Sequence, residues 1–236
     1  MWVHSSKDGE DEYSFMAYIP NFLSEKELNE CNEWLMNKYN YNYFIGAEHK
    51  QNRKQLWYQD NNNYFCSSWK NKYPRWEAQP KENYIQHLQD IISVKLRHKL
   101  EEHVSLERIK KMCGDKIDTN FNFNSTLVNC YEDKNKFIAP HRDNLNSFGL
   151  YPTIVGLSIG TTRTMRISKI AYNKDNLYSL KLETRETHKG LTMSIPLENN
   201  SVFVFLGSTN LYHVHEILPG KDDGIRFSLT VRTWKG

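Results

Sequence analysis

Apolar residues recur at helical spacing in two stretches of the N-terminal half. Ser24 and Glu27 form a capping-box pattern, in which a hydroxyl residue precedes an acidic one by three positions. Leu28, Cys31 and Leu35 then follow near helical spacing. The pattern predicts a first helix of about four turns that begins at residue 24.

A second and stronger helical pattern follows Pro80. Its apolar positions share a spacing of three or four residues, whereas the nearby lysines and arginines fall elsewhere; they are Ile85, Leu88, Ile92, Leu96 and Leu100. We expect an amphipathic helix that ends near residue 102. Residues 42–79 between the helices lack this periodicity and are rich in Asn, Tyr, Trp and Lys, which predicts short strands and loops.

From residue 125 onward the pattern changes to short β-like runs. The runs cover residues 125–132, 152–159, 162–168, 177–183, 191–197, 201–207 and 225–233. Strands this short and this closely spaced are typical of a sandwich, barrel or jelly roll, with the helices packed outside it. The 236 residues suit one domain, so we expect a single domain over residues 1–236, mostly β with flanking helices (α+β).

Composition excludes several classes of protein. Aromatic residues make up 13% of the chain, too many for a disordered one, and a net charge of +3 falls short of a dedicated nucleic-acid binder. The longest apolar run, Val202 to Leu206, is too short to span a bilayer, so we expect no membrane association. The first 15 residues lack an apolar signal region, and the four cysteines form no CxxC pair. An intracellular protein with reduced thiols is expected.

Histidines and a carboxylate offer a candidate metal site. In an extended segment, residues two apart project to the same face, so His141 and Asp143 can meet one ion. His213 and His215 supply a third ligand from a later segment. Two histidines and one carboxylate leave open coordination positions for non-haem iron(II) oxygen chemistry. Either histidine can close the site, the other then facing the substrate or supporting a ligand; we prefer His215.

The last predicted strand has one apolar and one cationic face. Arg226, Ser228, Thr230 and Arg232 alternate with Phe227, Leu229 and Val231. The two arginine Cα atoms lie about 20 Å apart at about 3.3 Å per residue. Because guanidinium groups match carboxylates in bidentate fashion, a dicarboxylate with separated charges is a suitable ligand.

Two further patterns lead to weaker hypotheses. Aromatic residues in the segment 42–79 alternate with Lys50, Arg53, Lys54, Lys70, Lys72 and Arg75, which fits either stacking platforms beside phosphate contacts or packing under a long loop. Residues 156–160 match the G-x-S-x-G pattern of serine hydrolases. That pattern needs a helix after its turn, whereas a strand is expected here, so a hairpin near Gly160 is simpler.

Together these motifs resemble the AlkB family of iron(II)- and 2-oxoglutarate-dependent dioxygenases, closest to its nucleic-acid repair members. The resemblance rests on Asn129-Cys130-Tyr131, His141-Arg142-Asp143, residues 152–160, Thr162-Arg163, His215 before Pro219, and the strand from Arg226 to Arg232. It covers residues 125–234 well, and extends more faintly to residues 53–76 and to the start of the first helix.

The resemblance implies a fold, a site and an activity. It implies a double-stranded β-helix (jelly roll) over residues 125–236, preceded by helices and a nucleotide-recognition lid in residues 1–124. The implied ligands of Fe(II) are His141, Asp143 and His215; those of 2-oxoglutarate are Asn129, Tyr131, Arg226, Ser228 and Arg232; those of the substrate are Arg53, Lys54, Gln55, Trp57, Tyr58 and Arg163. The implied reaction uses O2 to demethylate N-alkylated bases of DNA or RNA oxidatively, in a monomer.

Some residues depart from the family pattern and keep two alternatives open. Asn144 follows Asp143 where repair members usually place an acidic residue, and Ser228 stands where Asn is common. His215 lies four residues before Pro219, where three is usual. The first alternative is an oxygenase for another substrate, such as another base mark, a free nucleotide or a protein side chain. The second is a nucleic-acid binder without catalysis.

Overall fold

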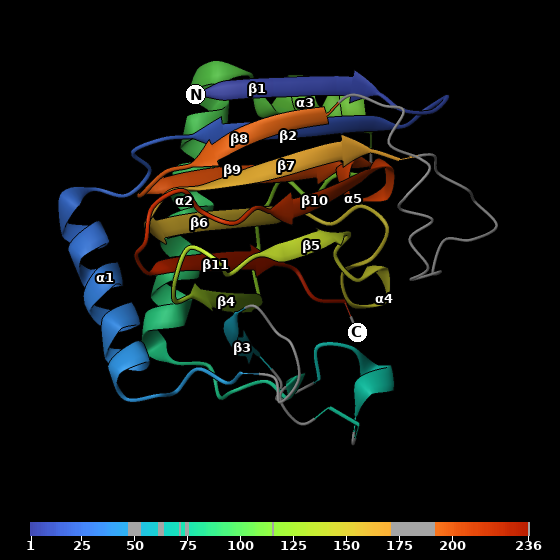
Figure 1. Ribbon diagram of the computed structural model, residues 1–236. Coiled ribbons are helices and arrows are strands. Elements are labelled where there is room, and N and C mark those ends of the chain that lie inside the picture. Colours follow the sequence, from blue (N-terminus) through green and yellow to red (C-terminus); the bar gives the residue numbers. More distant parts are fainter. Residues whose placement is uncertain are drawn as a thin grey trace.

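Two antiparallel sheets built from distant parts of the chain form the centre of the molecule (Figure 1). The computed structural model describes residues 1–46, 53–60, 64–70, 72–73, 76–114, 116–170 and 192–235. Within these residues the larger sheet has seven strands, in the spatial order β1 (Trp2–Lys7), β2 (Tyr13–Ile19), β9 (Ser201–Gly207), β6 (Ile154–Gly160), β11 (Arg226–Arg232), β4 (Ser125–Tyr131) and β3 (Lys54–Gln59). The smaller sheet has four, in the order β5 (Ile138–His141), β10 (His213–Ile217), β7 (Arg163–Lys169) and β8 (Thr192–Leu197).

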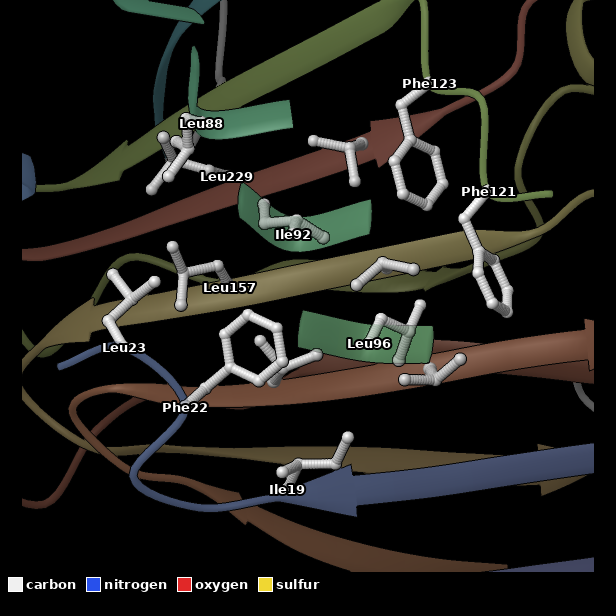
Figure 2. Packing of buried hydrophobic residues seen from close by; sticks show 14 of the residues in the cluster. Ile19, Phe22, Leu23, Leu88, Ile92, Leu96, Phe121, Phe123, Leu157 and Leu229 are labelled. Carbon is white, nitrogen blue, oxygen red and sulfur yellow. The ribbon is translucent and has the colours of Figure 1, made fainter. Parts of the chain in front are cut away.

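Helices cover one face of the larger sheet. They are α1 (Glu25–Asn40), α2 (Asn83–His103) and α3 (Leu106–Cys113), and α2 passes behind the sheet in Figure 1. Figure 2 shows Leu88, Ile92 and Leu96 of α2 beside Leu157 of β6 and Leu229 of β11. These buried side chains belong to the main hydrophobic core. Burial of this apolar stripe is what fixes α2 against the sheet.

The other face of the larger sheet meets the smaller sheet. A second core of buried residues fills part of this space, with Met16 and Phe205 from the larger sheet and Met165, Ile167 and Ile195 from the smaller one. Because side chains alternate along a strand, β11 places Phe227, Leu229 and Val231 in the main core. Its polar residues therefore lie on the side that faces the smaller sheet.

The two predicted long helices and the β-rich fold class are confirmed. Helix α1 begins after Ser24, which makes the complete capping box with Glu27. The predicted strands near residues 125, 152, 162, 191, 201 and 225 correspond to β4, β6, β7, β8, β9 and β11. The run 177–183 lies outside the described residues. No helix in the described residues is both long and apolar enough to span a membrane.

The N-terminal part adds strands to the helices that we expected there. Its first 19 residues form strands β1 and β2, and β2 pairs with β9 from the C-terminal half. Strand β3 lies in the segment 42–79, where short strands were expected, and it extends the larger sheet beside β4. Strands β5 and β10 and helices α3, α4 (Leu145–Phe148) and α5 (Thr209–Tyr212) were also not predicted. Elements this short carry only a weak hydrophobic pattern, and the strands that they contact are distant in sequence. Their positions could therefore not be predicted from the local sequence.

Candidate metal centre and cosubstrate site

Three side chains meet at the end of the smaller sheet in a group that could hold a metal ion. Strand β10 pairs with β5 so that His215 lies directly opposite His141, and the two ring centroids are 4.3 Å apart. Asp143 follows two residues after His141. One ligand atom from each of the three residues lies within 4.8 Å of the others. Two imidazoles and a carboxylate at this spacing form the ligand set of a facial metal site.

Both histidines are held in the neutral form that a metal ion requires. Nδ1 of His141 lies 2.9 Å from the carbonyl oxygen of Ala139, so Nδ1 carries the proton and Nε2 is left to accept a metal. Burial lowers the pKa of His141, and it lowers the pKa of His215 to about 3. Phe205 packs edge-on against the ring of His215, with centroids 5.4 Å apart. Neutral imidazoles are therefore available at physiological pH.

Asp143 is fixed through both its side chain and its backbone. Nε of Arg232 donates to Oδ2 of Asp143 at 2.6 Å, and both side chains are buried. Burial alone would raise the pKa of Asp143, but the Arg232 guanidinium beside it holds that pKa below its usual value. The carboxamide of Asn210 bonds the backbone N–H and C=O of the same residue, at 2.9 and 3.0 Å. The carboxylate is thus ionised and held in place before any metal binds.

The polar face of β11 holds a second buried guanidinium, at its other end. Arg226 is fully buried, lies 4.9 Å from the centroid of the Tyr131 ring and donates from Nη2 to Oγ of Ser158 at 3.0 Å. Its Nε and Nη1, Nη1 of Arg232 and the hydroxyl of Tyr131 find no hydrogen-bond partner within the described part of the chain. Buried donors of this kind require a partner. A dicarboxylate such as 2-oxoglutarate, with one end at each arginine, fits these groups.

Asn129 connects strand β3 to this face. It lies opposite Ser228 in the β4–β11 pair, and its Oδ1 accepts hydrogen bonds from Nε of Arg53 at 2.7 Å and Nε2 of Gln55 at 3.1 Å. The carboxamide oxygen of Asn129 is therefore already hydrogen-bonded, so its NH2 group is the part of the side chain left to contact a ligand. Arg53 and Gln55 consequently lie beside the expected cosubstrate residues rather than on a separate surface.

A cavity of about 190 Å³ joins the metal group to the part of this polar face from Ser228 to Arg232, whereas Arg226 is not among its lining residues. Its polar lining includes His141, Asp143, His215, Asn129, Tyr131, Ser228 and Arg232. On another side it is lined by Phe65, Trp69 and Trp76, which pack against one another with ring centroids 4.9 to 5.7 Å apart. The cavity thus combines metal ligands, anion-binding groups and an aromatic wall.

The remaining residues expected to bind substrate lie elsewhere. Trp57 is buried among Phe65 and Phe148, and Tyr58 points to the opposite face of β3, where its hydroxyl bonds Glu82. Lys54 pairs with Glu132 at 2.7 Å.

The guanidinium of Arg163 is likewise not in the cavity. It is buried and donates to backbone carbonyls at Asp133, Thr162, Asp222 and Gly224. Residues 50–52, 61–63, 71, 74 and 75 of the expected lid lie outside the described residues. The structure therefore brings Arg53 to the cavity and Gln55 only to the side chain of Asn129, and it leaves Lys54, Trp57, Tyr58 and Arg163 away from the cavity.

The structure distinguishes between His213 and His215 and shows the setting of the G-x-S-x-G pattern. His213 lies away from the metal group: its Nδ1 is 3.3 Å from the carbonyl oxygen of Thr209 and 3.4 Å from Oγ of Ser14. Ser158 of the G-x-S-x-G pattern sits within β6, with β7 after the turn instead of a helix. The geometry therefore favours His215 in the metal group and does not support a serine nucleophile.

Some residues of the site were not expected from the sequence. Phe65, Trp69 and Trp76 were noted only as part of an aromatic segment, and Asn210 and Phe148 carried no recognisable signal. Phe148 places its ring 5.0 Å from the guanidinium carbon of Arg232. Only the density of aromatic residues between the two long helices could have indicated the cavity wall.

Comparison with known proteins assigns the class of the chain. A model of the 2OG-Fe(II) oxygenase superfamily matches residues 15–232, so the chain belongs to this superfamily. The match confirms the predicted class of dioxygenase and the predicted cofactors Fe(II), 2-oxoglutarate and O2.

Individual relatives are similar over shorter segments. Alpha-ketoglutarate-dependent dioxygenase alkB homolog 3 of Mus musculus is 29% identical over 100 residues, which are 42% of this chain and 32% of that protein. DNA oxidative demethylase ALKBH2 of Arabidopsis thaliana is 30% identical over 124 residues, which are 47% of this chain and 37% of that protein. The matched part thus spans about a third of each relative's length.

Proposed function

We propose that this protein is an iron(II)- and 2-oxoglutarate-dependent oxidative demethylase of N-alkylated bases in DNA or RNA. The observation that carries the proposal is the meeting of His141, Asp143 and His215 in one cavity with Tyr131 and Arg232, whose hydroxyl and Nη1 are buried and find no hydrogen-bond partner in the described residues. Iron(II) bound to the three residues would supply, with O2 and 2-oxoglutarate, the oxidising power to hydroxylate an N-alkyl carbon while 2-oxoglutarate becomes succinate and CO2.

Each expected cosubstrate residue has a role that its position suggests. Arg232 is anchored on Asp143, so it would receive the carboxylate next to the metal. Arg226, on the far side of Tyr131, would receive the distal carboxylate. Asn129 and Ser228 line the wall between the two ends and would hydrogen-bond the cosubstrate there.

Nucleic acid is the substrate that the relatives and the cavity favour. One relative bears the name DNA oxidative demethylase. Phe65, Trp69 and Trp76 form an aromatic wall on which a base withdrawn from its stack could lie beside the metal. Loss of the hydroxylated alkyl group from nitrogen then releases an aldehyde, which is formaldehyde for a methyl group.

A panel of methylated oligonucleotides tests the proposed substrate. Iron-loaded protein would be supplied with 2-oxoglutarate and with DNA or RNA strands that carry 1-methyladenine or 3-methylcytosine, alongside unmethylated strands of the same sequence. We expect formaldehyde only with methylated strands, and a stronger signal from one nucleic acid than from the other. Equal formaldehyde from methylated and unmethylated strands, or none from either, would contradict the demethylase.

An oxygenase with another substrate is the second candidate, and Asn144 is the observation that favours it. Asn144 lines the cavity, and its Oδ1 already accepts hydrogen bonds from the backbone N–H groups of Asn146 and Ser147, at 2.9 and 3.1 Å. A neutral amide here offers different contacts to a base than an acidic side chain would. Conversion of 2-oxoglutarate to succinate without formaldehyde from the oligonucleotides would support this candidate.

A further inference from the structure

Asn210 makes an unusual pair of contacts with one of the metal-group residues. Its side chain is buried, with 1% of its surface exposed, and lies in the short helix α5. Oδ1 accepts the backbone N–H of Asp143 at 2.9 Å, and Nδ2 donates to the backbone C=O of the same residue at 3.0 Å. One carboxamide therefore satisfies both main-chain polar groups of Asp143.

The two hydrogen bonds from Asn210 to Asp143 lie just beyond the point where the pairing of β5 with β10 ends. Strand β10 pairs with β5 at His215 and His141, and the same register two residues further on would place His213 opposite Asp143. Within the described residues that pair is not formed; His213 pairs with Lys169 on the other side. The Asn210 side chain thus supplies Asp143 with the donor and acceptor that a neighbouring strand would otherwise provide.

Helix α5 is itself tied to the larger sheet. Oγ1 of Thr209 accepts the backbone N–H of Phe15 in β2 at 3.1 Å and lies at 2.6 Å from the carbonyl oxygen of Leu206. The C-terminal residue of α5 leads directly into β10, which carries His215. Nη1 of Arg142 also donates to the carbonyl oxygen of Leu211, at 3.2 Å. The segment that holds Asp143 is therefore docked on the helix that sets the position of His215.

We propose that Asn210 is a positioning residue that fixes the Asp143 carboxylate relative to His215, and that it thereby raises the affinity of the site for its divalent metal ion. The inference rests on the proposed metal site. Arg232 orients the carboxylate from the side-chain end, whereas Asn210 fixes the backbone from which it projects. Groups that orient metal ligands typically contribute about 10- to 100-fold in metal affinity.

The chain offers a matched control for this arrangement. The carboxamide of Asn200 makes the same pair of bonds, accepting the backbone N–H of Leu23 at 2.7 Å and donating to its C=O at 2.8 Å. Asn200 does not line the cavity and belongs to the turn before β9. Its backbone φ of +58° adds strain to any alanine placed there. The Asn200→Ala variant should therefore lose at least as much stability as Asn210→Ala.

The test compares metal affinity with stability in the protein of residues 1–236. Co(II) would be titrated into wild type, Asn210→Ala and Asn200→Ala without 2-oxoglutarate, followed by its visible absorption, and each metal-free protein would be unfolded in urea. We expect Asn210→Ala to bind Co(II) about 10- to 100-fold more weakly with an altered spectrum. Asn200→Ala should keep the wild-type affinity and spectrum despite its stability loss.

Several outcomes would overturn the inference. Wild-type Co(II) affinity in folded Asn210→Ala, or an equal loss of affinity in Asn200→Ala, would show that Asn210 has only a structural role. If Asn210→Ala does not fold, Asn210→Asp takes its place, because a carboxylate keeps the acceptor but loses the donor. Wild-type affinity in that variant would equally overturn the inference. Failure of wild type to bind Co(II) would instead contradict the proposed metal site itself.

Discussion

Arg226 is a buried cation whose side chain is only partly satisfied by its neighbours. Its Nη2 bonds Ser158 and its guanidinium lies against the Tyr131 ring, while burial lowers its pKa. A buried charge of this kind lowers the stability of the fold unless a ligand of opposite charge pairs with it. The residue is therefore better explained by ligand binding than by folding.

Replacement of Arg226 by methionine should separate these two roles. We expect the Kd of 2-oxoglutarate for Mn(II)-loaded protein to rise about 10- to 100-fold, because a hydrogen bond to a charged group contributes about 1.5–3 kcal/mol. The stability of the metal-free protein should stay the same or rise, since a buried charge is removed. Calorimetric titration and urea unfolding would measure the two quantities.

The matched control is Arg97→Met. Arg97 is exposed on α2 and its guanidinium donates to the carbonyl oxygen of Asn120. Its replacement should leave the affinity for 2-oxoglutarate unchanged. If Arg226→Met bound 2-oxoglutarate as tightly as Arg97→Met does, the assignment of Arg226 to the distal carboxylate would be wrong.

At the scale of single elements, helix α1 depends on the capping box at its start. Glu27 accepts the backbone N–H of Ser24 at 2.7 Å, and the Ser24 hydroxyl accepts the N–H of Glu27 at 3.4 Å. We expect Ser24→Ala to lower the free energy of unfolding by about 1 kcal/mol. Lys26→Ala, in the same turn, removes only an exposed ion pair to Glu30 and should change it by less than about 0.5 kcal/mol. Equal effects in urea unfolding would argue against a cap-dependent helix.

The hairpin between β6 and β7 requires glycine at its turn. Gly160 has a φ of +91°, and a Cβ there would lie 2.4 Å from the carbonyl oxygen of Ile225. We expect Gly160→Ala to cost more than about 1 kcal/mol in urea unfolding, because strain and a backbone clash add. Gly46→Ala meets only the Lys54 side chain, at 3.9 Å, and serves as the control. A cost no larger than that of the control would contradict the described turn.

At the scale of the whole molecule, metal binding should stabilise the fold, because the three candidate ligands come from β5, the segment after it and β10. Mn(II) at 100 times its Kd should add about 2.7 kcal/mol. For a chain of this size that corresponds to a rise in Tm of about 5–10 °C. Thermal unfolding of wild type with and without Mn(II) would measure it, and Asp143→Ala should show no rise. An equal rise in that variant would place the metal elsewhere.

Local patterns could predict some of this architecture, and contacts distant in sequence could not be predicted. Ser24 and Glu27 are three residues apart, and His141 and Asp143 two, so their geometry follows from the local backbone. Asn210 and Asp143 are 67 residues apart and meet only because α5 leads into β10, which pairs with β5. Arg163 was expected to bind substrate, but the loops around it bury it and supply carbonyl acceptors.

The N-terminal strands illustrate the same limit. Strand β1 is a mostly polar edge strand with weak alternation, so nothing local marks it as part of the sheet. Its position is fixed by pairing with β2, and that of β2 by pairing with β9, nearly 190 residues further along the chain. Pairings of this range are decided by the packing of the whole molecule and not by the pattern of either segment.

Turnover of 2-oxoglutarate by the intact protein tests the central claim most directly. Succinate would be measured with Fe(II) and a methylated oligonucleotide for wild type, for wild type with a chelator, and for folded Asp143→Ala and His215→Ala variants. We expect succinate from iron-loaded wild type alone. Succinate formation that survives the chelator or persists in Asp143→Ala, or its absence from wild type with every substrate offered, would contradict an iron and 2-oxoglutarate centre built from these residues.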